Sequence, residues 1–144
     1  MTFSGAINTA TINDDTVSVT GGTGVDTITL TDTSMASVTV DGGTGTDSIA
    51  SVGAGAHVAT YKDMDSLTLS ANATGSTTTV TGTSATAVTF GATGQTLASS
   101  SSALTTVTAY ATGTLALSGT GAFTVTGQTT GAITSTGSGA LTLT

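Results

Sequence analysis

The sequence predicts an all-β protein built as a parallel β-solenoid, of the β-helix or β-roll kind, and three observations carry this prediction. Triplets recur along all 144 residues, and in each of them a middle residue, usually Thr or Ser, stands between two residues that are usually apolar. Gly-rich breaks separate the triplets. Aromatic residues make up only 3% of the chain, so any core must be thin and aliphatic. Alternation with period 2 indicates half-buried strands, and many copies of one thin unit indicate a repeat protein.

Each triplet predicts one strand. β-branched Thr, Val and Ile favour the pleated backbone, and neighbouring residues of a strand point to opposite faces. We therefore expect the two outer residues of each triplet to face the core and the middle residue to face solvent. In chain order, the expected strands are centred on residues 17–19, 28–30, 38–40, 67–69, 88–90, 107–109, 115–117, 123–125, 133–135 and 141–143. The pattern loosens over residues 50–66, and over residues 97–104 a run of Ser predicts a loop.

The spacing of the triplets predicts the size of one coil. Where the pattern is clearest, successive triplets begin at positions 17, 28 and 38, and again at 115, 123, 133 and 141. Two such half-turns make a coil of roughly 18 to 20 residues, the size of a β-helix coil. An antiparallel sandwich of short strands would show similar spacing. Because the same residue types recur at equivalent positions, the solenoid is the preferred interpretation.

Charge is confined to the first part of the chain. All 8 acidic residues are Asp and lie between positions 14 and 65, and the single basic residue is Lys62, giving a net charge of −7. We expect one solenoid domain over residues 1–144, with acidic coils over 1–65 and uncharged coils over 66–144. The lack of a basic patch argues against nucleic acid as a partner. With no Cys and a single His, and with no paired nucleophile and base, we expect no enzyme. No apolar run is long enough for a transmembrane segment.

One motif carries chemistry. Residues 21–29 and 42–50 both fit the nonapeptide G-G-x-G-x-D-x-U-x, in which U is apolar, at every fixed position. Its glycines permit the positive φ values of a tight turn, and Asp26 and Asp47 supply hard carboxylate oxygens. One turn offers too few of the about six to eight oxygens that Ca²⁺ takes, so a second turn must stack on it. The two Asp residues lie 21 positions apart, about one coil, which predicts a calcium site at one edge of the stack. The alternative is two ordinary Gly-rich turns with solvated Asp side chains.

A second calcium ion is an open possibility near the start of the chain. Asn13–Val17 resembles a degraded copy of the motif, in which Asp15 takes the place of Asp26. Asp14 and Asp15 would share this ion with Asp32, which lies about one coil further along the chain.

Five further side chains are weaker candidates. Asp63 and Asp65 have the right chemistry for ligands, but the preferred interpretation is a pair of solvated loop carboxylates. His57 is expected in a loop or on the surface. Tyr61 and Tyr110 are expected to pack against the core or to cap it.

The two nonapeptides resemble the repeats of RTX proteins. The segment that follows, which ends in Asp63-Met-Asp-Ser-Leu-Thr-Leu-Ser70, is similar to the coil after such repeats in bacterial surface-layer proteins and in large adhesins exported by type I secretion. The resemblance implies that Asp26 and Asp47 are calcium ligands. It also implies that turn carbonyls complete the shell, namely those of Gly21, Thr23, Gly43 and Gly45.

These observations lead to an expected function. We expect a secreted, extracellular structural protein: a calcium-stabilised solenoid whose copies assemble into a bacterial surface layer or filament. An adhesin or carbohydrate-binding module is the alternative, with cell-surface polysaccharide as its partner. Ice binding ranks lower. Thr-x-Thr pairs occur at 27/29, 106/108, 124/126, 134/136 and 142/144, but they are unevenly spaced along the sequence, and the strand propensity of Thr also explains them.

Overall fold

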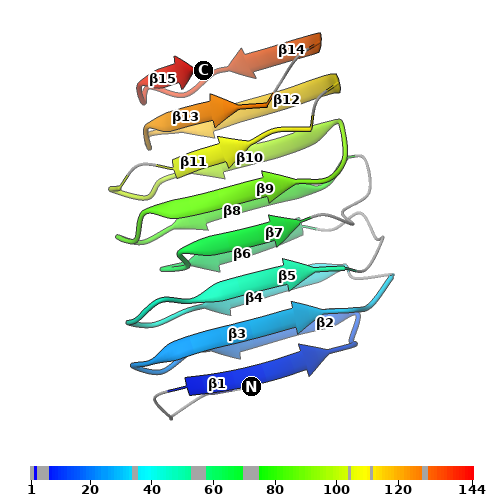
Figure 1. Cartoon of the computed structure of the whole chain (residues 1–144), viewed down its shortest axis with the longest axis vertical. Helices are drawn as coiled ribbons and strands as arrows, with labels where there is room; N and C mark the ends of the chain where they lie inside the picture. Colours follow the sequence, from blue (N-terminus) through cyan, green and yellow to red (C-terminus); the bar gives the residue numbers. More distant parts are fainter. Residues whose placement is uncertain are drawn as a thin grey trace.

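The computed structural model of the chain describes residues 2, 7–33, 36–52, 58–69, 75–103, 105–110, 112–127 and 130–144. Within these residues the chain forms fifteen strands and no helix. The odd-numbered strands make one sheet of eight, the even-numbered strands make a second sheet of seven, and every pairing is parallel (Figure 1). The predicted all-β parallel β-solenoid is therefore confirmed, and the antiparallel sandwich is excluded.

The strands alternate between the two sheets along the chain. The odd sheet contains β1 (Ile7–Ile12), β3 (Val25–Leu30), β5 (Ser48–Ser51), β7 (Ser66–Leu69), β9 (Thr86–Phe90), β11 (Thr105–Thr108), β13 (Phe123–Thr126) and β15 (Leu141–Leu143). The even sheet contains β2 (Thr16–Thr20), β4 (Ser37–Asp41), β6 (Val58–Lys62), β8 (Thr77–Thr81), β10 (Gln95–Ser99), β12 (Thr112–Gly119) and β14 (Thr130–Ser135).

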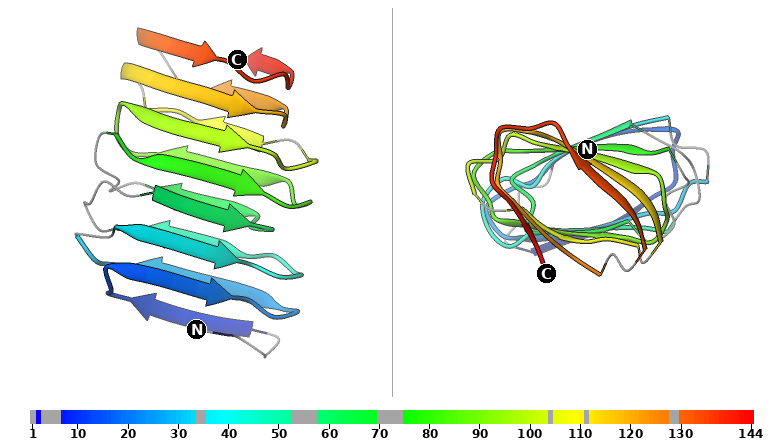
Figure 2. Two further views of the ribbon diagram at one scale, coloured as in Figure 1. Left: turned by 180° about the vertical axis from the view of Figure 1, so that it is seen from behind. Right: turned by 90° about the horizontal axis from the view of Figure 1, so that it is seen from above.

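Each coil lies in register on the one before it. Asn8 pairs with Asp26, and Thr27 pairs with Ser48. The first pair is separated by 18 residues and the second by 21 residues, so coil length is slightly more variable than the period of the triplets suggested. Viewed along the stack, the coils outline one flattened tube with a sheet on each broad side (Figure 2). Each coil therefore has two corners, one before the odd strand and one before the even strand.

The interior is a ladder of aliphatic side chains from both sheets. The outer residues of the first eight predicted triplets, from Val17 to Val125, are all buried, and none of the middle residues is. Leu141 and Leu143 align with the buried Phe123 and Val125, as predicted for inward residues, but they are exposed. They belong to the last strand of the odd sheet, and no further coil of the described structure covers them.

The structure corrects the expectation for the segment 97–104. Residues up to Ser99 belong to strand β10, in which Leu97 is completely buried. The alternation here is Gln-Thr-Leu-Ala-Ser, so the polar side chains of Gln95 and Ser99 occupy inward positions that the triplet pattern reserves for apolar ones. Tyr61 and Met64, from the other loosened segment, also lie in the core, which confirms the packing role expected for Tyr61. His57 lies outside the described residues.

With no helix among the described residues, there is none of the length and apolar character needed to cross a membrane.

Truncating a core residue and its outward neighbour should have very different effects. Leu67 is fully buried in β7, whereas the next residue, Thr68, faces solvent. We expect Leu67→Ala to lower the free energy of unfolding by about 2 to 5 kcal/mol because it leaves a cavity. Thr68→Ala should change it by no more than about 0.5 kcal/mol. Urea denaturation followed by circular dichroism measures both, and equal losses would contradict the assignment of the faces.

Candidate metal centre

The two nonapeptide turns stack directly on one another at the corner that precedes the odd strands. The Gly21 N–H donates to the Asp41 carbonyl at 2.6 Å, and the Thr44 N–H donates to the Gly22 carbonyl at 3.0 Å. Gly43 has φ of +85°, and a Cβ at this position would collide with the Gly22 carbonyl oxygen. The second turn therefore requires glycine both for its backbone conformation and for its contact with the first turn.

The motif carboxylates do not face solvent; they point into the coil. Asp26 and Asp47 are both completely buried. The Asp26 N–H donates to Asp47 Oδ1 at 2.8 Å, and the Asp47 N–H donates to Asp65 Oδ2 at 2.8 Å. On the other side of Asp26, Asn8 Nδ2 donates to Asp26 Oδ1 at 2.5 Å. Asn8, Asp26, Asp47 and Asp65 thus form one column, which we call the carboxylate column. Its rungs are about 4.8 Å apart, as in any sheet.

The strand pairing continues this column through the uncharged coils. Thr86 and Thr105 occupy the next two positions, and both are buried. The Thr86 hydroxyl donates to the Met64 carbonyl at 2.8 Å. The position after Thr105 is Phe123, which belongs to the apolar core. One corner of the solenoid thus changes along its length from carboxylate to hydroxyl to hydrocarbon.

One buried carboxylate oxygen in the column has no hydrogen-bond partner. In the first turn the Gly22 N–H donates to Asp26 Oδ2 at 3.1 Å. In the second turn the equivalent N–H, that of Gly43, donates to Asp41 Oδ1 at 3.1 Å instead. Asp47 Oδ2 is therefore buried and unsatisfied. Leaving a buried charged group in this state is costly.

The surroundings of Asp47 oppose its ionisation. Burial raises the pKa of the Asp47 carboxyl above its ordinary value, because desolvation penalises the charged form. The hydrogen bond from the Asp26 N–H acts in the opposite direction, and the negative charges of Asp26 and Asp65 raise the pKa further. A proton or a cation would relieve this strain.

Carbonyl oxygens approach both motif carboxylates closely at this corner. A Cβ at Gly42 would lie 2.5 Å from the Asp63 carbonyl oxygen, 2.8 Å from Asp47 Oδ2 and 2.9 Å from Met64 Sδ, so only glycine lets these three atoms come so near one another. A Cβ at Gly21 would collide in the same way with the Gly42 carbonyl oxygen and with Asp26 Oδ2. Hard oxygens of this kind suit Ca²⁺. Among the described residues no three acidic, His or Cys side chains converge on one point, so a cation here would depend on backbone carbonyls for most of its shell.

The structure brings some of the predicted ligands together and separates others. Asp26 and Asp47 are adjacent in the column, as their spacing of 21 residues predicted. The carbonyls beside their Oδ2 atoms are those of Gly42 and Asp63, which the motif did not single out. The roles assigned to the carbonyls of Gly21, Thr23, Gly43 and Gly45 remain predictions.

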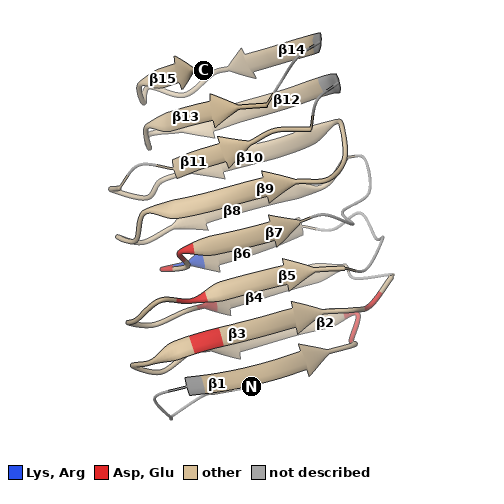
Figure 3. Cartoon of the chain, in the orientation of Figure 1, with Lys and Arg blue, Asp and Glu red and all other residues tan. Residues whose placement is uncertain are grey.

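Asp14, Asp15 and Asp32 lie at the opposite corner, which precedes the even strands (Figure 3). Asp15 therefore does not occupy the position of Asp26, because it precedes β2 of the even sheet, whereas Asp26 lies in β3 of the odd sheet. The expected stacking of their turns is present: the Ala36 N–H, from the turn of Asp32, donates to the Asp15 carbonyl at 2.8 Å. A second ion at this corner remains a prediction.

The expectation that Asp63 and Asp65 are solvated loop carboxylates is also wrong. Asp65 is half-buried and belongs to the carboxylate column. Asp63 accepts the Thr83 N–H at 2.6 Å, and this hydrogen bond holds the pKa of its carboxyl below the ordinary value. The exposed Lys62 amino group bridges Asp41 at 2.6 Å and Asp63 at 3.7 Å. The sequence signal for Asp65 was its distance of 18 residues from Asp47, one coil.

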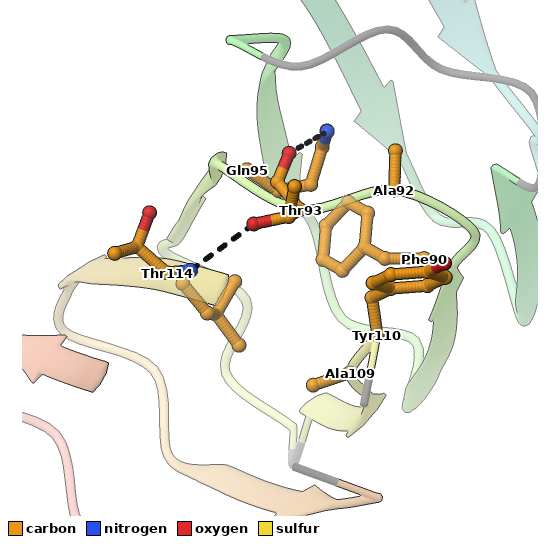
Figure 4. A pocket seen from close by; sticks show the side chains of 8 residues that line it. Phe90, Ala92, Thr93, Gln95, Ala109, Tyr110 and Thr114 are labelled. Atoms are coloured by element: carbon orange, nitrogen blue, oxygen red, sulfur yellow. Dashed lines mark hydrogen bonds between the residues drawn. The ribbon is translucent and has the colours of Figure 1, made fainter. Parts of the chain in front are cut away.

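A small hollow lies away from this corner, between Phe90 and Tyr110 (Figure 4). It measures about 10 Å³, which accommodates little more than one water molecule. Tyr110 packs beside Phe90 at the edge of the core, in agreement with the packing role expected for it. This hollow is no ligand site.

The fold and the corner define a class: a parallel β-solenoid with a buried carboxylate column along one edge. Comparison with family models, with curated proteins and with solved structures finds no match for this chain.

Neutralising Asp47 should stabilise the metal-free protein. In Asp47→Asn the amide keeps an acceptor for the Asp26 N–H, removes the buried charge and gains a donor beside the Asp63 carbonyl. We expect the free energy of unfolding in EDTA to rise by about 1 to 3 kcal/mol. Asp41→Asn, the same change at a half-buried residue paired with Lys62, should leave it equal or slightly lower. A loss of stability in Asp47→Asn alone would show that the Asp47 carboxylate is satisfied in the free protein.

Proposed function

We propose that this chain is a calcium-stabilised structural solenoid of the RTX type, secreted and working outside the cell. The observation that carries the proposal is the pair of stacked nonapeptide turns whose buried carboxylates include one unsatisfied oxygen, Asp47 Oδ2. Asp26 and Asp47, with neighbouring carbonyls such as those of Gly42 and Asp63, would hold the ion. Bound calcium would supply positive charge to a column of three carboxylates that otherwise repel one another. Calcium concentrations outside cells suit sites of this weak, carbonyl-rich kind.

Calcium should therefore stabilise the folded chain. Extracellular sites bind with a Kd on the order of 10⁻⁴ to 10⁻³ M. By mass action, about 10 mM Ca²⁺ should then raise the free energy of unfolding by about 1.4 to 2.7 kcal/mol. Mg²⁺ should do much less, because it is smaller and sheds its water reluctantly. Thermal and urea denaturation in EDTA, Ca²⁺ and Mg²⁺ measure these differences.

The double variant Asp26→Asn, Asp47→Asn is the matched control. It should fold, it should be at least as stable as wild type in EDTA, and it should lose the calcium increment. A wild-type chain that is indifferent to calcium, or a double variant that responds as wild type does, would refute the calcium proposal.

We further propose that copies of the chain stack end to end into a filament or surface layer. In the coil formed by β13, β14 and β15, the exposed fraction is 58% for Leu143 and 37% for Leu141. Beside them is a hollow of about 260 Å³ lined by Val125, Gly131, Ile133, Leu143 and Thr144. The outer backbone groups of β14 and β15 have no neighbouring strand in the described structure. Such an edge favours pairing with a further strand, and head-to-tail pairing without closure gives an open filament.

Assembly can be tested with one charge at this end. We expect the chain to form particles larger than a monomer in calcium, and Leu143→Asp to prevent this, since it buries a charge at the contact. Val58→Asp alters a residue of similar exposure, 60%, on a broad face of the stack, and should assemble normally. Light scattering and negative-stain microscopy give the readout. Monomers at every concentration would refute assembly and make an adhesin or carbohydrate-binding module, with polysaccharide as partner, the leading function.

A further inference from the structure

The odd sheet carries an ordered array of hydroxyl side chains on its outer side. The register aligns outward residues of its strands into two rows that run the length of the stack, and β3 presents a third outward residue, the exposed Val25, beside them. We call this surface the Thr face. Five of eight residues in one row and seven of eight in the other are Thr, and the remainder are Ser or Ala. The rows are Thr9, Thr27, Ser48, Ser66, Ala87, Thr106, Thr124, Thr142 and Thr11, Thr29, Ala50, Thr68, Thr89, Thr108, Thr126, Thr144.

The uneven spacing of Thr pairs along the sequence disappears in the folded chain. A longer stretch of chain separates Thr68 from Thr89 than separates Thr108 from Thr126, yet both pairs are direct neighbours in the sheet. The turns absorb the extra residues, so the strands remain in register. The uneven spacing that ranked ice binding low is therefore no objection. Only the pair Thr134/Thr136 falls elsewhere, on and just after β14 of the even sheet.

The Thr face has two fixed repeat distances. Neighbouring Thr residues of one row lie about 4.8 Å apart, the spacing of strands, and the two rows lie roughly 6.7 Å apart, two residues along a strand. Thr is β-branched, so its χ1 angle is restricted and its hydroxyl and methyl groups are held in place before any ligand arrives. A surface that is ordered beforehand binds at a smaller entropic cost.

Charge is absent from the Thr face, and the opposite face differs. No outward residue of the described odd strands is charged. On the even sheet, Val58 interrupts one row, and the ion pair of Asp41 and Lys62 lies at the end of its strands. The register also aligns outward Thr residues on the even sheet, but they fill seven of thirteen paired positions in two such rows there, against twelve of sixteen in the two rows of the Thr face. The array is therefore more complete on the odd sheet, although the strand propensity of Thr acts on both.

We propose that the Thr face binds ice. A two-dimensional array of hydroxyl and methyl groups complements a periodic surface better than it complements a soluble molecule, which would contact only a few rungs. Ice presents a lattice of hydrogen-bonding water oxygens with repeats on the scale of the two distances above. A crystalline polysaccharide is also periodic, but sugar rings stack on exposed aromatic side chains, and the two rows contain none. This inference goes beyond the proposed structural role and requires only that the solenoid is folded.

Two matched double variants test the proposal. Thr68→Tyr with Thr89→Tyr places two bulky residues on adjacent rungs of the Thr face. Thr39→Tyr with Thr60→Tyr makes the same change on adjacent rungs of the even sheet. Tyr suits strands, so both variants should fold, which circular dichroism in calcium verifies. Wild type and the even-sheet variant should shape growing ice crystals and depress their growth temperature, and the Thr-face variant should lose both effects.

Two results would overturn the proposal. The first is a folded wild-type chain that leaves ice crystals unshaped and their growth temperature unchanged, whether or not it binds crystalline cellulose or chitin in a parallel sedimentation assay. The second is an equal loss of ice shaping in the two folded variants, which would show that the Thr face is not the contact.

Discussion

Parallel, in-register stacking is the constraint on which the rest of this structure depends. Because each coil pairs with the next through its backbone, every residue lies directly above and below the equivalent residues of neighbouring coils. A residue type that recurs at one position of the coil therefore forms a continuous row along the stack. This produces the aliphatic ladder inside, the carboxylate column at one corner and the rows of Thr on the odd sheet. A chain with so few large side chains reaches a stable fold by repeating a thin core rather than by enlarging it.

The same constraint is costly where the repeated residue is charged. Asp26, Asp47 and Asp65 are stacked at the spacing of strands, and the two Asp residues of the nonapeptides are fully buried. Backbone N–H groups satisfy much of this column. Asp47 Oδ2 is the exception, because Asp41 takes the Gly43 N–H that would otherwise serve it. The cost is local, since the column continues as Thr86 and Thr105 in the coils that carry no charge.

Much of the fold could be predicted from the sequence because strand alternation is a local signal. The triplets identified the buried faces of most strands, and the spacing of the nonapeptides placed Asp26 and Asp47 together. The sequence could not distinguish the two corners of a coil. The number of residues from an odd strand to the next even strand is nearly the same as the number from an even strand to the next odd strand. For this reason Asp15 was equated with Asp26. Turn length hid further features: the short turn before Asp65 placed this residue in the column, and unequal turns concealed the regularity of the Thr rows.

A crystal structure of the chain grown with calcium tests the central claim most directly, since it examines the register and the buried carboxylates together. The account predicts a calcium ion bound to Asp47 Oδ2 at about 2.3 to 2.6 Å, with backbone carbonyls of the stacked turns in its shell. It also predicts Asp26, Asp47 and Asp65 on successive rungs of one column. A structure in which Asp47 faces solvent, or in which a protein donor satisfies its second oxygen and no ion is bound, would contradict it.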